Sequence, residues 1–347
     1  TDGMGHAIYG YLFIKYFSPV AQYARIIRHH HATLAQLPAG YAYNDVIQLL
    51  HLADALDLLL QSGIRGEQAY RDFVDANRGH LFSPCIADLF FASGVRPHKT
   101  EQDNTQDEGF QYILTQKAFS GEEMEAYLGM TVLSIDFRSS HTVTHTITTT
   151  SICKTLAILM NLDNATVEKI QIAAFLHDLG KTAIPLSILE GTHALSPPEY
   201  AIMRSHVAVT DEIIRGNVSE DIQKMAVRHH EKLDGSGYPN GLPAHRLTVP
   251  ERLIAIGDIF SALHSPRSYK RAFPKEKTLA ILAGMVRDGL LDGDIVAVAA
   301  KNFDYIVKRI LQDSSPTLAG YELLSAEHAR MAMQKEPAHS IVKPFGP

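Results

Sequence analysis

The residues best suited to chemistry lie in one short segment, AAFLHDLGKTAIP, where an apolar stretch ends in the adjacent residues His177 and Asp178. An imidazole offers one nitrogen ligand to a metal, whereas a carboxylate has two oxygens and can bridge two metals. We expect Gly180 to end the helix and to let Lys181 face the same site. Alone, such a pair is more often an ordinary polar contact at a helix end, so a metal site requires further ligands.

Further histidine and aspartate residues are distributed through neighbouring apolar segments, as they are in metal sites built between the helices of a bundle. The candidate metal ligands are His145, His177, Asp178, His206, His229, His230 and Asp258. Seven nitrogen and oxygen ligands suit two metals with positions left open for substrate oxygens. The sequence therefore predicts a binuclear metal centre.

Two further motifs accompany these ligands. A glycine-rich loop in HHEKLDGSGYP contains Gly237, Tyr238 and Pro239, and the later segment SPRSYKR contains Arg267 and Lys270. Together with the seven ligands and Lys181, these motifs resemble those of the HD-GYP family of bacterial phosphodiesterases. The resemblance covers about residues 130–310.

The resemblance implies an all-helical domain whose iron or manganese centre hydrolyses a 3′–5′ cyclic dinucleotide to its linear form. In this interpretation two metals clamp phosphate oxygens and activate water, Asp178 bridges the metals, and Lys181 stabilises charge on the phosphoryl group. Arg267 and Lys270 match positions that bind substrate phosphate, while Tyr238 belongs to the substrate-binding loop with a more structural role. His141 stands where family members with three metals carry a glutamate. Its imidazole is a candidate ligand, but the replacement argues against a third metal.

The segments that carry the candidate ligands are predicted to be helices. Apolar residues recur with helical spacing over residues 45–60, 152–162, 166–179, 198–215, 220–230, 251–263 and 277–286, and strand-like alternation is scarce. We therefore expect an all-α protein with two helical-bundle domains. The expected division is a partial HD-GYP-like domain over 1–95, a polar linker over 96–125, the catalytic domain over 126–320 and a C-terminal tail over 321–347. The threonine-rich run 145–151 is expected to be helix surface.

The first half of the chain contains a faint copy of the second. His6, His29 and His30 precede His206, His229 and His230 by a constant interval, and Asp54 precedes Asp258 by nearly the same one. The first half has no His-Asp-x-Gly-Lys segment and no glycine-rich counterpart of the GYP loop. We therefore expect it to be structural, regulatory or the site of homodimerisation, rather than a second metal site.

Composition and net charge limit the kinds of ligand and the location that we expect for the protein. The 347 residues carry a net charge of −6, which argues against a protein that binds nucleic-acid polymers, because these need a broad basic surface. No apolar run approaches the roughly 18 residues of a membrane span, so the cytoplasm is the expected location. The substrate is expected to be c-di-GMP or 3′,3′-cGAMP. A non-enzymatic cyclic-dinucleotide receptor and an HD-superfamily mononucleotide hydrolase remain the alternatives.

Overall fold

The computed structural model describes residues 3–94, 123, 126–127, 129–130, 140–189, 191, 193–264 and 272–333. Every regular element in these ranges is a helix, and only two isolated β-bridges occur there. This confirms the predicted all-α fold. Among the same residues, no helix combines the length and apolarity that crossing a membrane requires.

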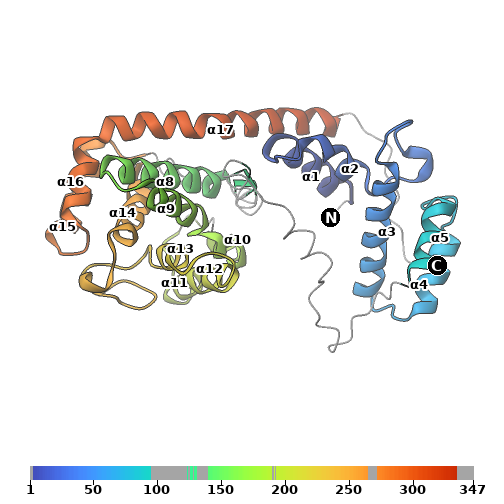
Figure 1. Ribbon diagram of the computed structural model, residues 1–347, viewed down its shortest axis with the longest axis horizontal. Helices are drawn as coiled ribbons and strands as arrows, with labels where there is room; N and C mark the ends of the chain where they lie inside the picture. Colours follow the sequence, from blue (N-terminus) through green and yellow to red (C-terminus); the bar gives the residue numbers. More distant parts are fainter. Residues whose placement is uncertain are drawn as a thin grey trace. The chain divides into compact units, whose positions relative to one another are not determined.

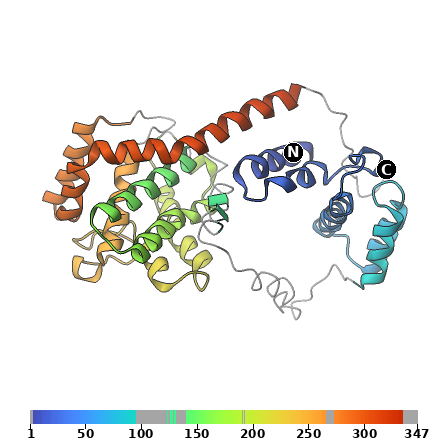
Figure 2. The same ribbon diagram turned by 45° about the horizontal axis from the view of Figure 1, so that its top comes forward.

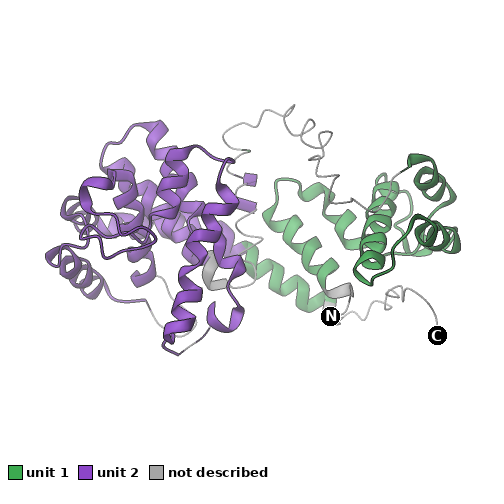
Figure 3. Cartoon of the chain, turned by 90° about the horizontal axis from the view of Figure 1, so that it is seen from below, with its two compact units in different colours: residues 1–123, 320–347 green, residues 124–319 purple. Residues whose placement is uncertain are grey.

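The chain divides into two compact units, residues 1–123 with 320–347 and residues 124–319, shown separately in Figure 3. The helices of unit 1 are α1 (Gly3–Phe17), η1 (Ala21–Tyr23), α2 (Ala24–His29), η2 (Leu34–Gln36), α3 (Asn44–Gln61), α4 (Glu67–Ala76) and α5 (Pro84–Ser93). Helix α1 packs against α2, and α5 packs against both α3 and α4 (Figure 1, Figure 2). The core under α3, α4 and α5 includes Leu52, Leu59, Tyr70 and Phe82.

The helices of unit 2 are α8 (Ser140–Leu159), α9 (Asn164–Leu176), η3 (Leu179–Ala183), α10 (Leu186–Leu189), α11 (Pro197–Arg204), α12 (His206–Ile214), α13 (Glu220–Val227), η4 (Ala244–Arg246), α14 (Val249–His264), α15 (Lys275–Arg287) and α16 (Gly293–Lys301). The last helix, α17 (Phe303–Met333), belongs to unit 2 up to Ala319 and to unit 1 from Gly320. Helices α9 and α14 both pack against α8 (Figure 1). A single apolar cluster fills this unit, with Ile152, Leu156, Ile170, Leu253 and Phe260 among its fully buried members.

The sequence determines how closely two of these helices approach. A Cβ on Gly257 of α14 would lie 2.3 Å from the Sγ atom of Cys153 on α8, which is far inside van der Waals contact. Glycine at this position therefore lets α8 and α14 come together. The same two helices carry His145 and Asp258, so this packing contact also brings two predicted ligands together.

Three details differ from the sequence-based expectations. The predicted helix over 198–215 is interrupted at Ser205, so that His206 begins a new helix, α12. Residues 321–333 are not a tail, because they continue α17 and belong to unit 1, where Lys15 pairs with Glu327 at 2.6 Å. The threonine-rich run is not surface, since Thr146, Thr148–Ser151 and Thr155 are buried. The predicted domain boundaries otherwise stay a prediction.

Candidate metal centre

All seven predicted ligands of unit 2 meet at the ends or inner faces of its helices. His145 lies in α8 and Asp258 in α14, while His206 is the first residue of α12. His177 is the C-terminal cap of α9, with Asp178 directly after it. His229 and His230 follow α13. Five of the seven candidate ligands therefore lie at or just beyond the end of a helix.

The ligand atoms form two groups, and one carboxylate lies between them. The first group consists of His145, His177 and Asp178, and the second of His206, His229 and His230, with the atoms of each group within 4.8 Å of one another. Oδ2 of Asp178 lies 3.1 Å from Nε2 of His177 and 3.5 Å from Nε2 of His145. Its Oδ1 lies 3.4 Å from Nε2 of His206. Each oxygen of Asp178 thus faces a different group of histidines.

Asp258 extends across both groups as well. Its Oδ1 lies 3.0 Å from Nε2 of His145, and its Oδ2 lies 3.6 Å from Nδ1 of His230. Two carboxylates with four oxygens therefore stand among five imidazoles. This is a set of hard and borderline donors typical of divalent iron, manganese or zinc.

Hydrogen bonds fix the orientation of the buried rings. Three imidazoles donate their Nδ1–H group to the carbonyl oxygen three residues earlier, from His177 to Ala174 (2.7 Å), from His206 to Met203 (2.6 Å) and from His229 to Ala226 (2.6 Å). In His145, Nδ1 lies 3.0 Å from Oγ of Ser261. Because a carbonyl oxygen only accepts, Nδ1 must carry a proton in the first three rings, which leaves Nε2 as the ligand atom of each ring in its neutral form.

Two of the inward-facing atoms are buried and make no hydrogen bond within the described part of the chain: Nε2 of His177 and Oδ1 of Asp178. Leaving a buried polar atom unpaired costs about 1–3 kcal/mol, and more for a charged group. A divalent cation between the two groups would satisfy both atoms. The residues present therefore fit a metal centre.

The electrostatics of the site keep three of its imidazoles neutral. Burial lowers the pKa of His206 and His229, and it lowers that of His230 to about 4, so these rings are neutral at pH 7. Burial would lower the pKa of His177 as well, but the adjacent carboxylate of Asp178 raises it. Burial would raise the pKa of Asp178, but the charges of His177 and Lys181 hold it well below the usual range. The carboxylate of Asp178 is therefore ionised.

Lys181 forms an ion pair with Oδ2 of Asp178, so the predicted ammonium group does lie at the centre. Gly180 has a different role from the one expected, because α9 already ends at Leu176. A Cβ on Gly180 would lie 2.0 Å from the carbonyl oxygen of His206. Glycine is needed here because η3 passes directly against α12.

The loop around Tyr238 borders the second group of histidines. The ring of Tyr238 lies 4.6 Å from that of His230, and the guanidinium of Arg204 lies 4.4 Å from the centre of the tyrosine ring. The buried carboxylate of Glu231 accepts hydrogen bonds from the backbone N–H groups of Asn240 (2.7 Å) and Leu242 (2.8 Å). Sequence reasoning missed Arg204, Glu231 and also Ser261, since no motif spacing connects them to the site.

The side chains of three predicted site residues lie outside the part of the chain that the structure describes. Arg267 and Lys270 belong to a segment outside the described residues, and the side chain of His141 does too. Their assignments therefore stay predictions.

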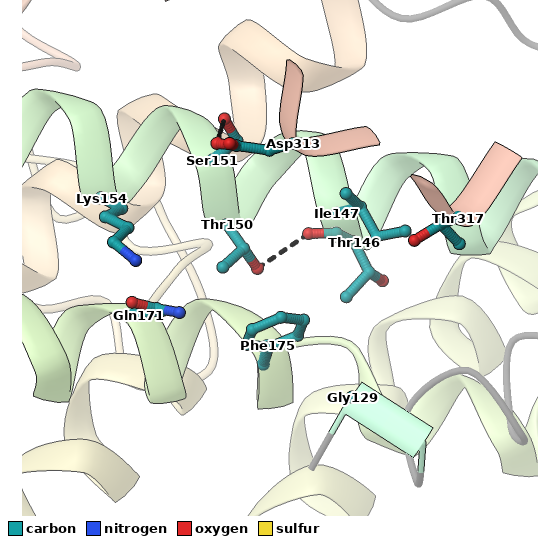
Figure 4. A pocket seen from close by; sticks show the side chains of 10 residues that line it. All are labelled: Gly129, Thr146, Ile147, Thr150, Ser151, Lys154, Gln171, Phe175, Asp313 and Thr317. Atoms are coloured by element: carbon teal, nitrogen blue, oxygen red, sulfur yellow. Dashed lines mark hydrogen bonds between the residues drawn. The ribbon is translucent and has the colours of Figure 1, made fainter. Parts of the chain in front are cut away.

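A cavity in unit 2 is separate from the metal centre. It has a volume of about 330 Å³ and lies beside α8, α9 and α17, with Thr150, Ser151 and Phe175 in its wall (Figure 4). The hydroxyl of Ser151 donates to Asp313 at 2.6 Å, and that of Thr150 donates to the carbonyl oxygen of Thr146. None of the seven candidate ligands lines this cavity.

The fold and the site together define the class of protein: an all-α bundle whose centre presents five histidines and two aspartates to divalent metals. Residues 132–295 match the HD domain family. The comparisons also confirm the resemblance to cyclic-dinucleotide phosphodiesterases of the HD-GYP type.

Among curated proteins, the chain is 40% identical over 126 residues to the cyclic di-GMP phosphodiesterase response regulator RpfG of Xanthomonas campestris pv. campestris. This alignment covers 35% of the chain and 33% of the relative, so the chain spans about a third of that protein's length. It is 26% identical over 321 residues to the 3′3′-cGAMP-specific phosphodiesterase 1 of Vibrio cholerae, covering 86% of the chain and 73% of the relative.

Among solved structures, one likeness is to the cyclic GMP-AMP-specific phosphodiesterase V-cGAP3 of V. cholerae. It has a TM-score of 0.52 at 19% identity and covers 86% of this chain and 71% of that one. At this level of identity the likeness shows a shared fold.

Proposed function

We propose that unit 2 is a metal-dependent phosphodiesterase that hydrolyses a 3′–5′ cyclic dinucleotide to its linear form. The observation that carries the proposal is the position of Asp178, whose two oxygens face two separate groups of histidines. A carboxylate placed in this way holds two metals side by side. Such a pair clamps the attacking and leaving oxygens of a phosphodiester, which is the chemistry that phosphoryl transfer to water needs.

In this proposal the centre holds two iron or manganese ions, which supply an activated water and Lewis acidity when bound. His145 and His177 would hold one of them and His206, His229 and His230 the other, with the carboxylates of Asp178 and Asp258 facing both groups. Lys181 is paired with Asp178 and keeps one-fifth of its side chain exposed, so its ammonium can also contact a phosphate at the centre. There it would stabilise the charge that develops on the phosphoryl oxygens.

The substrate would approach over the accessible edge of the site. His177 and His206 are buried, whereas the side chains of His230 and Lys181 are 26% and 20% exposed. Tyr238 lies beside His230 on this edge and can pack against a ribose or a base. The names of the relatives, which include cyclic di-GMP and 3′3′-cGAMP phosphodiesterases, support a cyclic dinucleotide as the substrate. We also retain the prediction of a homodimer formed through the first half.

The experiment is a chromatographic time course of the manganese- or iron-loaded chain with c-di-GMP and 3′,3′-cGAMP supplied together. We expect both metal content and hydrolysis to fall sharply in Asp178→Asn, because the neutral amide cannot bridge two cations. His245→Ala serves as a matched control, since it removes an exposed histidine of the same unit that is outside the metal set. Whichever substrate disappears faster identifies the base preference.

Two outcomes would count against the proposal. Full hydrolysis by Asp178→Asn would show that the bridging carboxylate is not required. Absence of hydrolysis of either dinucleotide by the metal-loaded chain, with binding retained, would indicate a cyclic-dinucleotide receptor instead.

A further inference from the structure

Unit 1 contains a separate cluster of three imidazoles. His6 lies on α1, while His30 and His31 directly follow α2. Nε2 of His6 lies 3.1 Å from Nε2 of His30 and 2.8 Å from Nε2 of His31. We propose that these three Nε2 atoms bind one divalent transition-metal ion, such as Zn²⁺, in unit 1.

The hydrogen bonds around the cluster leave the Nε2 lone pairs pointing inward. Nδ1 of His30 donates to the carbonyl oxygen of Ile27 at 2.6 Å, which places the proton on that nitrogen. Nδ1 of His31 faces Oδ2 of Asp54 at 3.5 Å, which favours a proton there as well. Both Nε2 atoms therefore present lone pairs to His6. One N–H group of His6 can satisfy only one of them, whereas a metal ion accepts all three lone pairs.

The cluster reproduces the second histidine group of unit 2. The ring centres of His30 and His31 are 3.9 Å apart, and those of His229 and His230 are 4.0 Å apart. His30 bonds to the carbonyl oxygen three residues earlier, as His229 does. The 3.5 Å separation of Asp54 from Nδ1 of His31 matches the 3.6 Å between Asp258 and Nδ1 of His230.

This geometry changes the alignment of the repeat that the sequence suggested. His30 corresponds to His229, and His31 corresponds to His230. The alignment of this histidine pair is therefore shifted by one residue, while His6 still corresponds to His206. His29 is not a member of the cluster. The sequence alignment paired His29 and His30 with the second histidine group, whereas the structure brings His30 and His31 to His6.

The chemistry at this cluster differs from that of unit 2. Within the described residues of unit 1, it is the only group of metal-binding side chains, and no bridging aspartate joins it to a second group. Three imidazoles suit a single zinc, nickel or copper ion, with a further coordination position open. His6 is exposed and His31 half-buried, so an ion can reach the site from solvent. Its effect would be to fasten α1 to the residues after α2 and so to stabilise unit 1.

The proposal does not depend on the activity of unit 2, and its test keeps the two apart. The full-length chain carrying His177→Ala, Asp178→Asn, His206→Ala and His230→Ala, which breaks both histidine groups of unit 2, is stripped of metal and titrated with Zn²⁺ by calorimetry. We expect one equivalent to bind in this background and to raise Tm. His6→Ala and His31→Ala should each abolish this binding. Removing a residue that only hydrogen-bonds to a metal ligand lowers metal affinity about 10–100-fold. We therefore expect the removal of a ligand itself to lower it about 100-fold or more.

His29→Ala is the matched control, since it removes the neighbouring imidazole outside the cluster and should bind Zn²⁺ as before. Because His6 is exposed, its replacement leaves the packing of unit 1 in place, and circular dichroism verifies this. The proposal is overturned if the background chain binds no Zn²⁺, or if His6→Ala binds it as tightly as His29→Ala. Neither result would affect the proposed phosphodiesterase activity, which is measured on the wild-type chain.

Discussion

Replacing Gly180 by alanine tests the geometry of the metal centre without altering any ligand. The added Cβ would lie 2.0 Å from the carbonyl oxygen of His206 and 2.6 Å from the backbone nitrogen of Thr210. Side-chain carbons essentially never come closer than 3.0 Å to another heavy atom, so one element must move by about 1 Å. Both opposing atoms belong to the backbone of α12, and therefore no rotamer change relieves the clash.

The required movement separates two parts of the site. Asp178 directly precedes η3 and Lys181 lies within it, whereas His206 begins α12. Metal–ligand distances tolerate only about 0.2 Å, so a shift of about 1 Å would take His206 out of reach of an ion shared with Asp178. Overpacking of this kind costs about 1–3 kcal/mol of stability. A misplacement of about 1 Å at a reacting centre lowers turnover on the order of 10²-fold.

The assay compares bound metal and cyclic-dinucleotide hydrolysis in Gly180→Ala with those in a control, Gly284→Ala. Gly284 is also a helical glycine of unit 2, but its added Cβ would meet only a side-chain nitrogen at 3.6 Å. The control should keep its metal and gain slightly in stability, because alanine is the better helix former. If Gly180→Ala retains the metal content and rate of the control, then the close approach of η3 to α12 does not build the site.

Two more predictions concern side chains around the two units. Ser261→Ala removes the partner of Nδ1 in His145, so we expect metal affinity in unit 2 to fall about 10–100-fold, with the exposed Ser187→Ala as the control. Burial would raise the pKa of Glu327, but the hydrogen bond from Lys15 lowers this pKa below the usual 4.5. The ionised carboxylate therefore stabilises the fold at neutral pH, and this stabilisation is lost when acid protonates the group. Glu327→Gln should therefore lower the free energy of unfolding at pH 7 by at most about 1 kcal/mol, and the difference should vanish as acid protonates the wild-type group.

Each of these has a result that would contradict it. Metal titrations that superimpose for Ser261→Ala and Ser187→Ala would show that the hydroxyl does not orient His145. For Glu327, the measurement is Tm at pH 7 and at pH 3, compared with that of the exposed Glu322→Gln. A stability difference that persists unchanged at the lower pH would mean that the Lys15 pair is not its source.

Much of the candidate site was predictable from the sequence because metal coordination depends first on donor type. Histidine and aspartate at the right intervals in apolar helices already predicted seven ligands, and the structure brings all seven together. Helical periodicity likewise predicted the all-α fold, since it reflects the burial of one face of each helix. Both properties are local enough to be read along the chain.

Tertiary packing decided which atoms face one another. The division of the oxygens of Asp178 between two histidine groups depends on how η3 lies against α12, which only the absence of a side chain on Gly180 permits. The same holds in unit 1, where spacing favoured His29 and His30, whereas the end of α2 turns His30 and His31 toward His6. The spacing of residues in the sequence does not locate a helix end to within one residue. Moving one residue along a helix, however, changes the direction of the side chain by about 100° around the helix axis. The sequence therefore determined the chemistry of the ligands, and the packed helix ends determined their geometry.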